Sequence, residues 1–181
     1  MANDFKKLLA CFQELGFTPR VFSFEDRIKV QKLAVLLQQL NVKLGYDFNL
    51  YVRGPYSPDL AQDFFSHDVE KEKSAAKAQL DAKDAKAVGE LKRCFYDGFR
   101  TSILEICGTY AFLRYGRGMP EDEAVRKLKE LKPFYSEADV AVGISRAKQL
   151  FFKPTPADLE FIRRENELWD AVSAEAWAKT P

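Results

Sequence analysis

The sequence predicts a mainly α-helical protein, a bundle of six to eight helices with one or two short β-strands near residues 46–53. Over most of the chain, apolar residues recur at the spacing of one helix face. Between Tyr46 and Val52 they alternate with polar residues instead, which is typical of a half-buried strand. With 181 residues, 46% of them hydrophobic and 30% charged, the chain has the size and composition of one soluble globular domain.

The first two helices follow from their apolar spacing and their end signals. Apolar residues fall on one face over residues 5–15, and Gly16 is expected to end that helix. Ser23 can cap the next helix, which is apolar over so wide an arc that we expect it to be the central buried helix. Gln31 and Lys32 lie near its inner face, so each needs a hydrogen-bond partner if it is buried.

A strand, a turn and a helix come next, and we expect the other helices to pack around them. Gly54 and Pro55 are expected to break the strand. Ser57 can cap a helix, Pro58 fits the first helical position, and Asp59 suits the positive end of the helix dipole.

The second half of the chain begins with a change of composition. Residues 67–90 are rich in Lys, Ala and acidic residues, which predicts an exposed helix or a connector. The core pattern then resumes, with helices expected before Gly116, after Pro120 and after Ser136.

The strongest boundary signal is the Pro-Thr-Pro segment that starts at Pro154. We therefore expect a helical domain over residues 1–152 and a C-terminal amphipathic helix over residues 153–181 that packs on the same domain. Trp169 and Trp177 make this helix a candidate partner-binding helix, although large aromatic side chains more often pack on their own chain.

Net charge and cysteine content narrow the function classes. The net charge is +1, whereas strongly nucleic-acid-binding domains are usually more basic. The three cysteines have no metal-binding or redox spacing, which indicates small apolar residues in a reducing compartment. The chain has no signal-peptide pattern and no apolar run long enough to cross a bilayer, so we expect a cytoplasmic protein with no membrane partner and no cofactor.

Catalytic motifs are weak. Asp59, Asp63 and His67 are spaced to share one helix face, where they could hold a divalent metal. Three side chains in a row along a helix are too spread out to close a site without further ligands, so we predict no metal site. No serine-hydrolase elbow, phosphate-binding loop or dinucleotide motif occurs. A metal-dependent hydrolase is therefore the least favoured function, and the chain is expected not to be an enzyme.

A DNA-binding transcriptional regulator is the other alternative. The helix over residues 121–132 and the one after Ser136 are joined as in a helix-turn-helix. Glu137 and Asp139 open the second helix, however, and acidic residues are unfavourable where a recognition helix meets phosphate. The basic residues available for such a role are Arg53, Lys92, Arg93, Arg100, Arg114 and Arg117.

Three motifs carry a family resemblance. They are Arg27-x-x-x-Gln31-Lys32-Leu33, Leu44-Gly45-Tyr46-Asp47-Phe48 and Tyr51-x-x-Gly54-Pro55-Tyr56-Ser57-Pro58-x-Leu60. The chain resembles the YwgA-like family of uncharacterised bacterial and archaeal proteins over most of residues 23–150. It has a more distant likeness to Panacea-type antitoxin domains, which share a Gln-Lys-Leu helix followed by a strand and a Gly-Pro turn. The resemblance implies a small, helical, non-enzymatic module linked to regulation or toxin neutralisation, and it supplies no catalytic residues.

The favoured function is accordingly a protein-binding regulatory or antitoxin-like module, whose partner is a toxin-like or regulatory protein or a second copy of the chain. Tyr51, Arg53, Gly54, Pro55 and Tyr56 form the candidate binding surface. Tyr and Arg are frequent interface anchors, and here they lie at a rigid turn. The alternative is a purely structural role, in which Tyr56 packs under the turn and Arg53 pairs with a carboxylate. Full burial of Tyr51, Arg53 and Tyr56 would rule out a contact surface.

Overall fold

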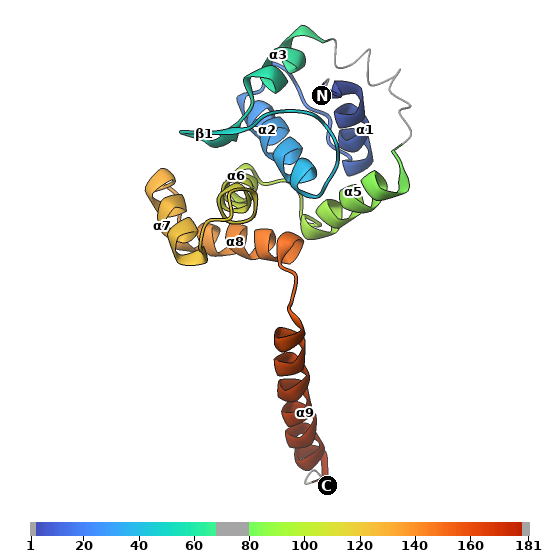
Figure 1. Ribbon diagram of the computed structural model, residues 1–181, viewed down its shortest axis with the longest axis vertical. Helices are drawn as coiled ribbons and strands as arrows, with labels where there is room; N and C mark the ends of the chain where they lie inside the picture. The colour runs from blue at the N-terminus through green and yellow to red at the C-terminus, as the bar shows by residue number, and fades with distance from the viewer. Residues whose placement is uncertain (1–2, 68–79, 179–181) are drawn as a thin grey trace. The chain divides into compact units, whose positions relative to one another are not determined.

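The computed structural model describes residues 3–67 and 80–178, apart from the side chains of residues 171–178. The chain divides into two compact units, Met1–Phe151 and Phe152–Pro181 (Figure 1). The described residues form eight α-helices, one π-helical segment and a two-stranded antiparallel sheet, so the predicted mainly α fold is confirmed. None of the helices in this described part is long and apolar enough to span a membrane.

The elements of the first unit are α1 (Phe5–Leu15), α2 (Phe24–Gln39), β1 (Asn49–Tyr51), β2 (Gly54–Tyr56), α3 (Pro58–Ser66), α5 (Ala82–Cys94), α6 (Thr101–Ala111), the π-helical segment η1 (Phe112–Gly116), α7 (Glu121–Leu131) and α8 (Glu137–Phe151). The second unit contains α9 (Pro156–Ala178). Whether α9 packs on the first unit stays a prediction.

The first two helices begin and end on the expected kinds of residue. Asp4 caps α1 by accepting a 2.9 Å hydrogen bond from the backbone N–H of Lys7. Gly16 ends α1 with a positive φ of 73°, a conformation that glycine adopts without strain. Ser23 caps α2 by accepting from the backbone N–H of Asp26.

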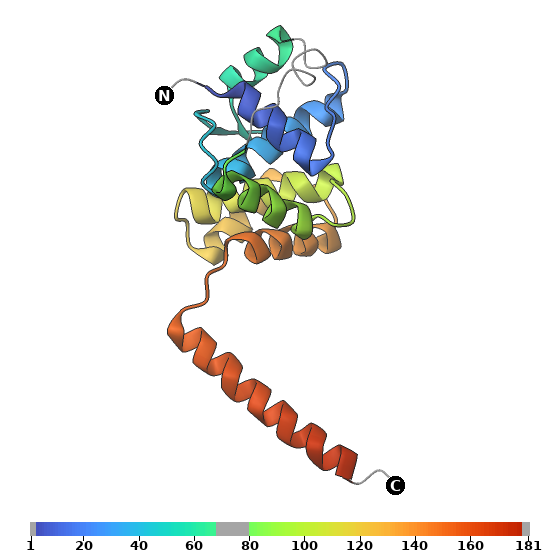
Figure 2. The same cartoon turned by 90° about the vertical axis from the view of Figure 1, so that its right-hand side faces the viewer.

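The core of the first unit is built on α2 and α6. Helix α2 is buried over most of its surface, as its apolar pattern predicts. Helix α6 lies between α2 and α8 and packs against both (Figure 2). Every residue of α6 from Ile103 to Ala111 is buried. A Cβ atom at Gly143 of α8 would lie 2.4 Å from a side-chain carbon of Ile106, so the two helices approach more closely than a larger residue would allow.

Helix α5 belongs to this core more than its composition indicates. Part of the Lys- and Ala-rich segment, residues 68–79, lies outside the described residues. The rest forms most of α5, which buries Ala87, Val88 and Leu91. Ala87 and Val88 of this segment therefore lie with Leu91 on a packed face of α5.

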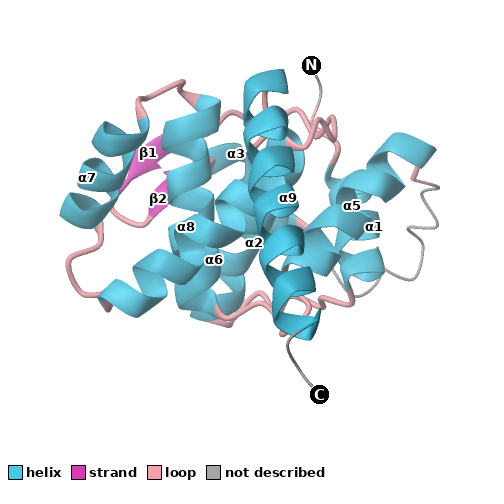
Figure 3. Cartoon of the chain, turned by 90° about the horizontal axis from the view of Figure 1, so that it is seen from below, coloured by secondary structure: helices cyan, strands magenta, loops and turns pink. Residues whose placement is uncertain are grey.

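Strands β1 and β2 lie side by side as a hairpin (Figure 3), and this hairpin differs from the predicted strand in the position of its turn. Tyr51 pairs with Gly54, so the turn consists of Val52 and Arg53. The prediction that Gly54 and Pro55 break the strand was wrong, because these two residues begin β2. The expected alternation also fails at Val52, which is 81% exposed because it lies in the turn.

Gly54 is required by its surroundings on α6. Its φ is +84°, and a Cβ atom at this position would lie 2.1 Å from the Thr109 hydroxyl oxygen. Any side chain would push β2 away from α6, so glycine fixes the depth at which the hairpin sits.

Candidate functional site

Two glutamines on α2 hold the segment that carries the hairpin. The Gln31 amide accepts a hydrogen bond from the backbone N–H of Ser57 at 2.9 Å and donates one to its carbonyl at 3.0 Å. The Gln38 amide pairs in the same way with both backbone groups of Tyr46, at 2.9 and 2.8 Å. Residues seven apart lie on the same side of a helix, so one face of α2 anchors the segment at two points.

Lys32 is the second polar residue on the inner face of α2. It is 2% exposed, and its ammonium donates a 2.6 Å hydrogen bond to the Pro55 carbonyl. Burial lowers the pKa of Lys32 from its usual 10.5 to about 7, against the opposing attraction of Glu105. The expectation that Gln31 and Lys32 need partners if buried is confirmed, and both partners belong to the hairpin corner, residues 54–57.

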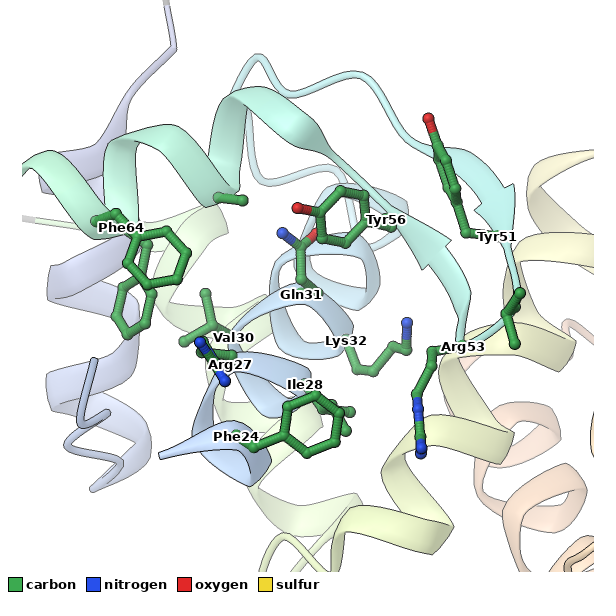
Figure 4. Close-up of a pocket in the computed structure, with 13 residues that line it drawn as sticks. Phe24, Arg27, Ile28, Val30, Gln31, Lys32, Tyr51, Arg53, Tyr56 and Phe64 are labelled. Carbon is green, nitrogen blue, oxygen red and sulfur yellow. The ribbon is translucent and has the colours of Figure 1, made fainter. Parts of the chain in front are cut away.

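A cavity of about 530 Å³ opens between α2, the hairpin and α3 (Figure 4). This volume lies in the range of ligand-binding pockets, and most of the lining side chains are apolar or aromatic. None of the described residues that line it is acidic, whereas three are cationic. The lining residues are Phe24, Arg27, Ile28, Val30, Gln31, Lys32, Tyr51, Val52, Arg53, Tyr56, Ala61, Phe64 and Phe65.

Exposed aromatic side chains surround the opening of the cavity. Phe24, Tyr51 and Phe65, which we call the aromatic rim, are 54%, 49% and 55% exposed. The Arg27 guanidinium lies over the rings of Phe24 and Phe65, 5.5 and 5.7 Å from their centroids. The Arg53 guanidinium lies 5.3 Å from the centroid of Phe24. Large aromatics gathered in the open together with arginine are typical of a contact surface.

A buried charge cluster supports the hairpin from the side of α6. The Glu105 carboxylate is fully buried, forms an ion pair with Lys132 and accepts a 2.9 Å hydrogen bond from the Tyr135 hydroxyl. Lys132 also donates to the Val52 carbonyl at 3.2 Å, and burial lowers its pKa. The Arg53 guanidinium lies 3.8 Å from the carboxylate, so Glu105 is close to two cations, Lys132 and Arg53.

The predicted binding residues divide into exposed and supporting ones. Tyr51 is 49% exposed, and the side chain of Arg53 is 52% exposed although it is near Glu105. Tyr56 is half-buried, with its ring edge-on to that of Tyr51 at 5.4 Å. The full burial that would rule out a contact surface is therefore not found. Gly54 and Pro55 are buried and position the hairpin.

Sequence reasoning missed the part of the site that lies outside the hairpin. Phe24 and Arg27 lie in the first two turns of α2, and Phe65 lies near the end of α3. An available signal was Phe24 itself, an aromatic residue at the very start of a helix whose other apolar residues already account for its packing. Their convergence depends on how α2 and α3 meet, which the local sequence does not encode.

Asp59, Asp63 and His67, which the sequence places on one helix face, lie at α3, and the contacts of Asp63 and His67 are with nearby residues of the first unit. His67 follows the end of α3, where a ring nitrogen lies 2.8 Å from the Asp63 carbonyl oxygen and the ring packs against Phe5. The Asp63 carboxylate accepts a 2.8 Å hydrogen bond from the Tyr46 hydroxyl. Asp59 lies exposed in the first turn of α3. Over residues 3–67 and 80–178, no group of three or more His, Cys, Asp or Glu side chains is placed to hold a metal ion.

The basic residues considered for DNA binding are spread over several elements of the first unit. Arg100, which precedes α6, forms an ion pair with Asp139 of α8. Lys92 of α5 donates to the Glu14 carbonyl at the end of α1. These contacts engage Arg100 and Lys92 with other groups of the chain.

In the second unit, Trp169 is 70% exposed and its neighbour Leu168 is 68% exposed. The side chain of Trp177 lies outside the described residues. A unit that consists of one helix has no second element of its own on which to bury these side chains, so a partner-binding role for α9 stays a prediction.

Comparisons of the chain with known protein families, with curated proteins and with solved structures found no match. The resemblance to the YwgA-like family therefore stays a prediction, and the candidate site rests on its own geometry.

Proposed function

We propose that the chain is a non-enzymatic protein-binding module that binds a segment of a regulatory or toxin-like partner at the cavity beside the hairpin. The observation that carries this proposal is the open apolar cavity with its aromatic rim of Phe24, Tyr51 and Phe65. Protein interfaces commonly centre on a few large side chains that enter such pockets, with aromatic and arginine residues prominent among them.

The contacts that hold the hairpin corner in the cavity wall support this proposal. Gln31 and Lys32 fix the hairpin corner to α2, and Gly54 fixes its depth against α6. A site held in this way is ordered before its partner arrives, so little conformational entropy is lost when the partner binds. The partner class follows from the sequence resemblance to regulatory and antitoxin-like modules.

The test is capture of partner proteins from a native lysate. It compares variants of the aromatic rim with a variant of an exposed residue elsewhere on the surface. Proteins retained by the unmodified chain should be lost when Phe24→Ala and Tyr51→Ala are combined. Tyr96→Ala is the matched control, because Tyr96 is 81% exposed and does not line the cavity. A partner held equally by the rim variant would place the interface elsewhere, and retention of nucleic acid alone would contradict a protein-binding function.

A further inference from the structure

The charges that line the cavity are unbalanced. Arg27, Lys32 and Arg53 line it, and no acidic residue of the described chain does. The buried carboxylate of Glu105 forms an ion pair with Lys132, accepts a hydrogen bond from Tyr135, and lies 3.8 Å from Arg53. The cavity therefore has donors for an anion that the chain itself does not supply.

Arg27 has the most unused hydrogen-bonding capacity. Its guanidinium makes no hydrogen bond or ion pair with any residue that the structure describes, and its contacts are the ring faces of Phe24 and Phe65. Stacking of this kind holds the guanidinium in place while its five N–H donors remain available. An arginine that is ordered by aromatic rings, and whose donors are not used within the described chain, is well placed to bind an anion.

Arg53 adds a second available cation on the opposite wall. Its distance of 3.8 Å to Glu105 is longer than a hydrogen bond, and half of its side chain is exposed. Its guanidinium and that of Arg27 both lie against the ring of Phe24 (Figure 4). A single carboxylate near this ring would face positive charge from α2 and from the hairpin.

The apolar walls exclude a ligand that is only an anion. Behind the two arginines the cavity is lined by Ile28, Val30 and Phe64, which favour a large apolar group. The occupant with the best match therefore combines an apolar side chain with a neighbouring acidic group. Nucleic acid offers phosphates and flat bases that could stack on the exposed rings, but the buried aliphatic walls at Ile28 and Val30 suit an apolar side chain better, so a peptide is the better fit.

We propose that the partner segment places a Glu or Asp carboxylate between Arg27 and Arg53 and inserts an adjacent large apolar side chain into the cavity. The proposal rests on the protein-binding function proposed above and specifies the chemistry of the partner. The carboxylate would form charge-assisted hydrogen bonds with guanidinium groups that are already positioned.

Proton uptake on binding of an acidic peptide is a second measurable consequence of this proposal. The pKa of Lys32 is about 7, and a carboxylate brought into the cavity would raise it. Binding should then take up a fraction of a proton at neutral pH, and affinity should fall as pH rises above about 7. Repeating a calorimetric titration in buffers of different ionisation enthalpy measures this proton uptake directly.

The experiment is selection of phage-displayed random dodecapeptides on the immobilised full-length chain. We expect the enriched peptides to share an aromatic or large aliphatic residue with Glu or Asp within two positions. Synthetic peptides in which that acid is changed to its amide should bind roughly tenfold more weakly or worse. Arg27→Gln and Arg53→Gln should cause similar losses, whereas Arg126→Gln, which removes an exposed ion pair on α7, should leave binding unchanged.

Charge reversal excludes a purely structural effect of these variants. Selection on Arg27→Glu combined with Arg53→Glu should enrich lysine or arginine where the unmodified chain enriches acid. Apolar peptides without an acidic residue, still dependent on the aromatic rim, would overturn this inference and leave the proposed function in place. Enrichment that is independent of the rim would contradict both, and displacement of the acidic peptides by a single-stranded oligonucleotide would identify nucleic acid as the occupant instead.

Discussion

The Gln31 amide pairs with both backbone polar groups of Ser57, at 2.9 and 3.0 Å, as a neighbouring β-strand would. Helix α2 thereby supplies hydrogen bonds that a two-stranded sheet lacks on its outer side. Lys32 adds a third such bond, to the Pro55 carbonyl. An isolated hairpin is only marginally stable in water, so we infer that these bonds from α2 are what make the hairpin corner a fixed part of the cavity wall.

Replacement of Gln31 tests this anchor. Gln31→Leu keeps a side chain of similar size but leaves the buried N–H of Ser57 without a partner, whereas the Ser57 carbonyl still accepts a hydrogen bond from the backbone N–H of Ala61. A buried N–H without a partner lowers the free energy of unfolding by about 1 to 3 kcal/mol, and we expect a loss in this range in urea denaturation. Gln13→Leu, at an exposed position of α1, is the control and should change stability little. Equal losses in the two variants would show that the pairing has no special role.

The sequence predicts the helices of the first unit well because their signals are local. Apolar spacing places α1 and α2, and Ser57 and Pro58 place the start of α3. The two polar residues that interrupt the apolar arc of α2 even indicate that something must pair with them. Their partners could not be read from the pattern, because Gln31 and Ser57 are far apart along the chain and meet only in the folded structure.

The position of the hairpin turn and the lining of the cavity could not be predicted from the local sequence. A Gly-Pro pair is typical of a strand end, so the local sequence predicts a break at Gly54 and Pro55, although these residues begin β2. Glycine is needed at position 54 because Thr109 of α6 lies against it. Thr109 is distant in the sequence, so the residues around Gly54 do not indicate this contact. The cavity in turn depends on α2, the hairpin and α3 together, so no local sequence signal shows that Phe24 and Phe65 converge.

Gly54→Ala should be much more disruptive than alanine at a comparable glycine. At Gly54 the new Cβ meets the Thr109 hydroxyl at 2.1 Å, in addition to the strain of a positive φ. Gly118 has a φ of +68° with no atom within 4 Å of a built Cβ, so Gly118→Ala measures the strain alone, about 1 to 2 kcal/mol. We expect Gly54→Ala to cost about 3 kcal/mol or more in denaturant unfolding. Closely similar values for the two variants would mean that β2 can move away from α6 at no cost.

The buried ion pair of Glu105 and Lys132 should be far more sensitive than an exposed one. Glu105→Gln leaves the Lys132 ammonium buried without a countercharge, which typically lowers stability by about 3 to 5 kcal/mol. Glu130→Gln removes the exposed pairs of Glu130 with Arg126 and Lys127 and should have no measurable effect. Thermal and urea denaturation of both variants checks this contrast. A Glu105→Gln protein as stable as the unmodified chain would show that Lys132 reaches water or deprotonates without penalty.

Lys32 should make the stability of the protein depend on pH above neutrality. Its pKa is 10.5 in the unfolded chain and about 7 in the folded one, because burial disfavours the charged amine. Between these two values the unfolded state binds more protons, so the free energy of unfolding rises with pH. The effect is clearest below about pH 8.5. At higher pH the buried thiols of Cys11, Cys94 and Cys107, whose pKa values are raised from 9.0, contribute in the opposite direction.

We therefore expect the free energy of unfolding to rise by about 1 to 2 kcal/mol between about pH 7 and about pH 8.5, measured by urea denaturation. Lys32→Met removes the titrating amine and should flatten most of this rise. A smaller slope should remain, because burial also lowers the pKa of Lys132. Lys6→Met, at an exposed position of α1, should keep the full rise. An undiminished slope in Lys32→Met would show that the amine reaches solvent in the folded protein, and the proton uptake expected on binding an acidic peptide would then fail as well.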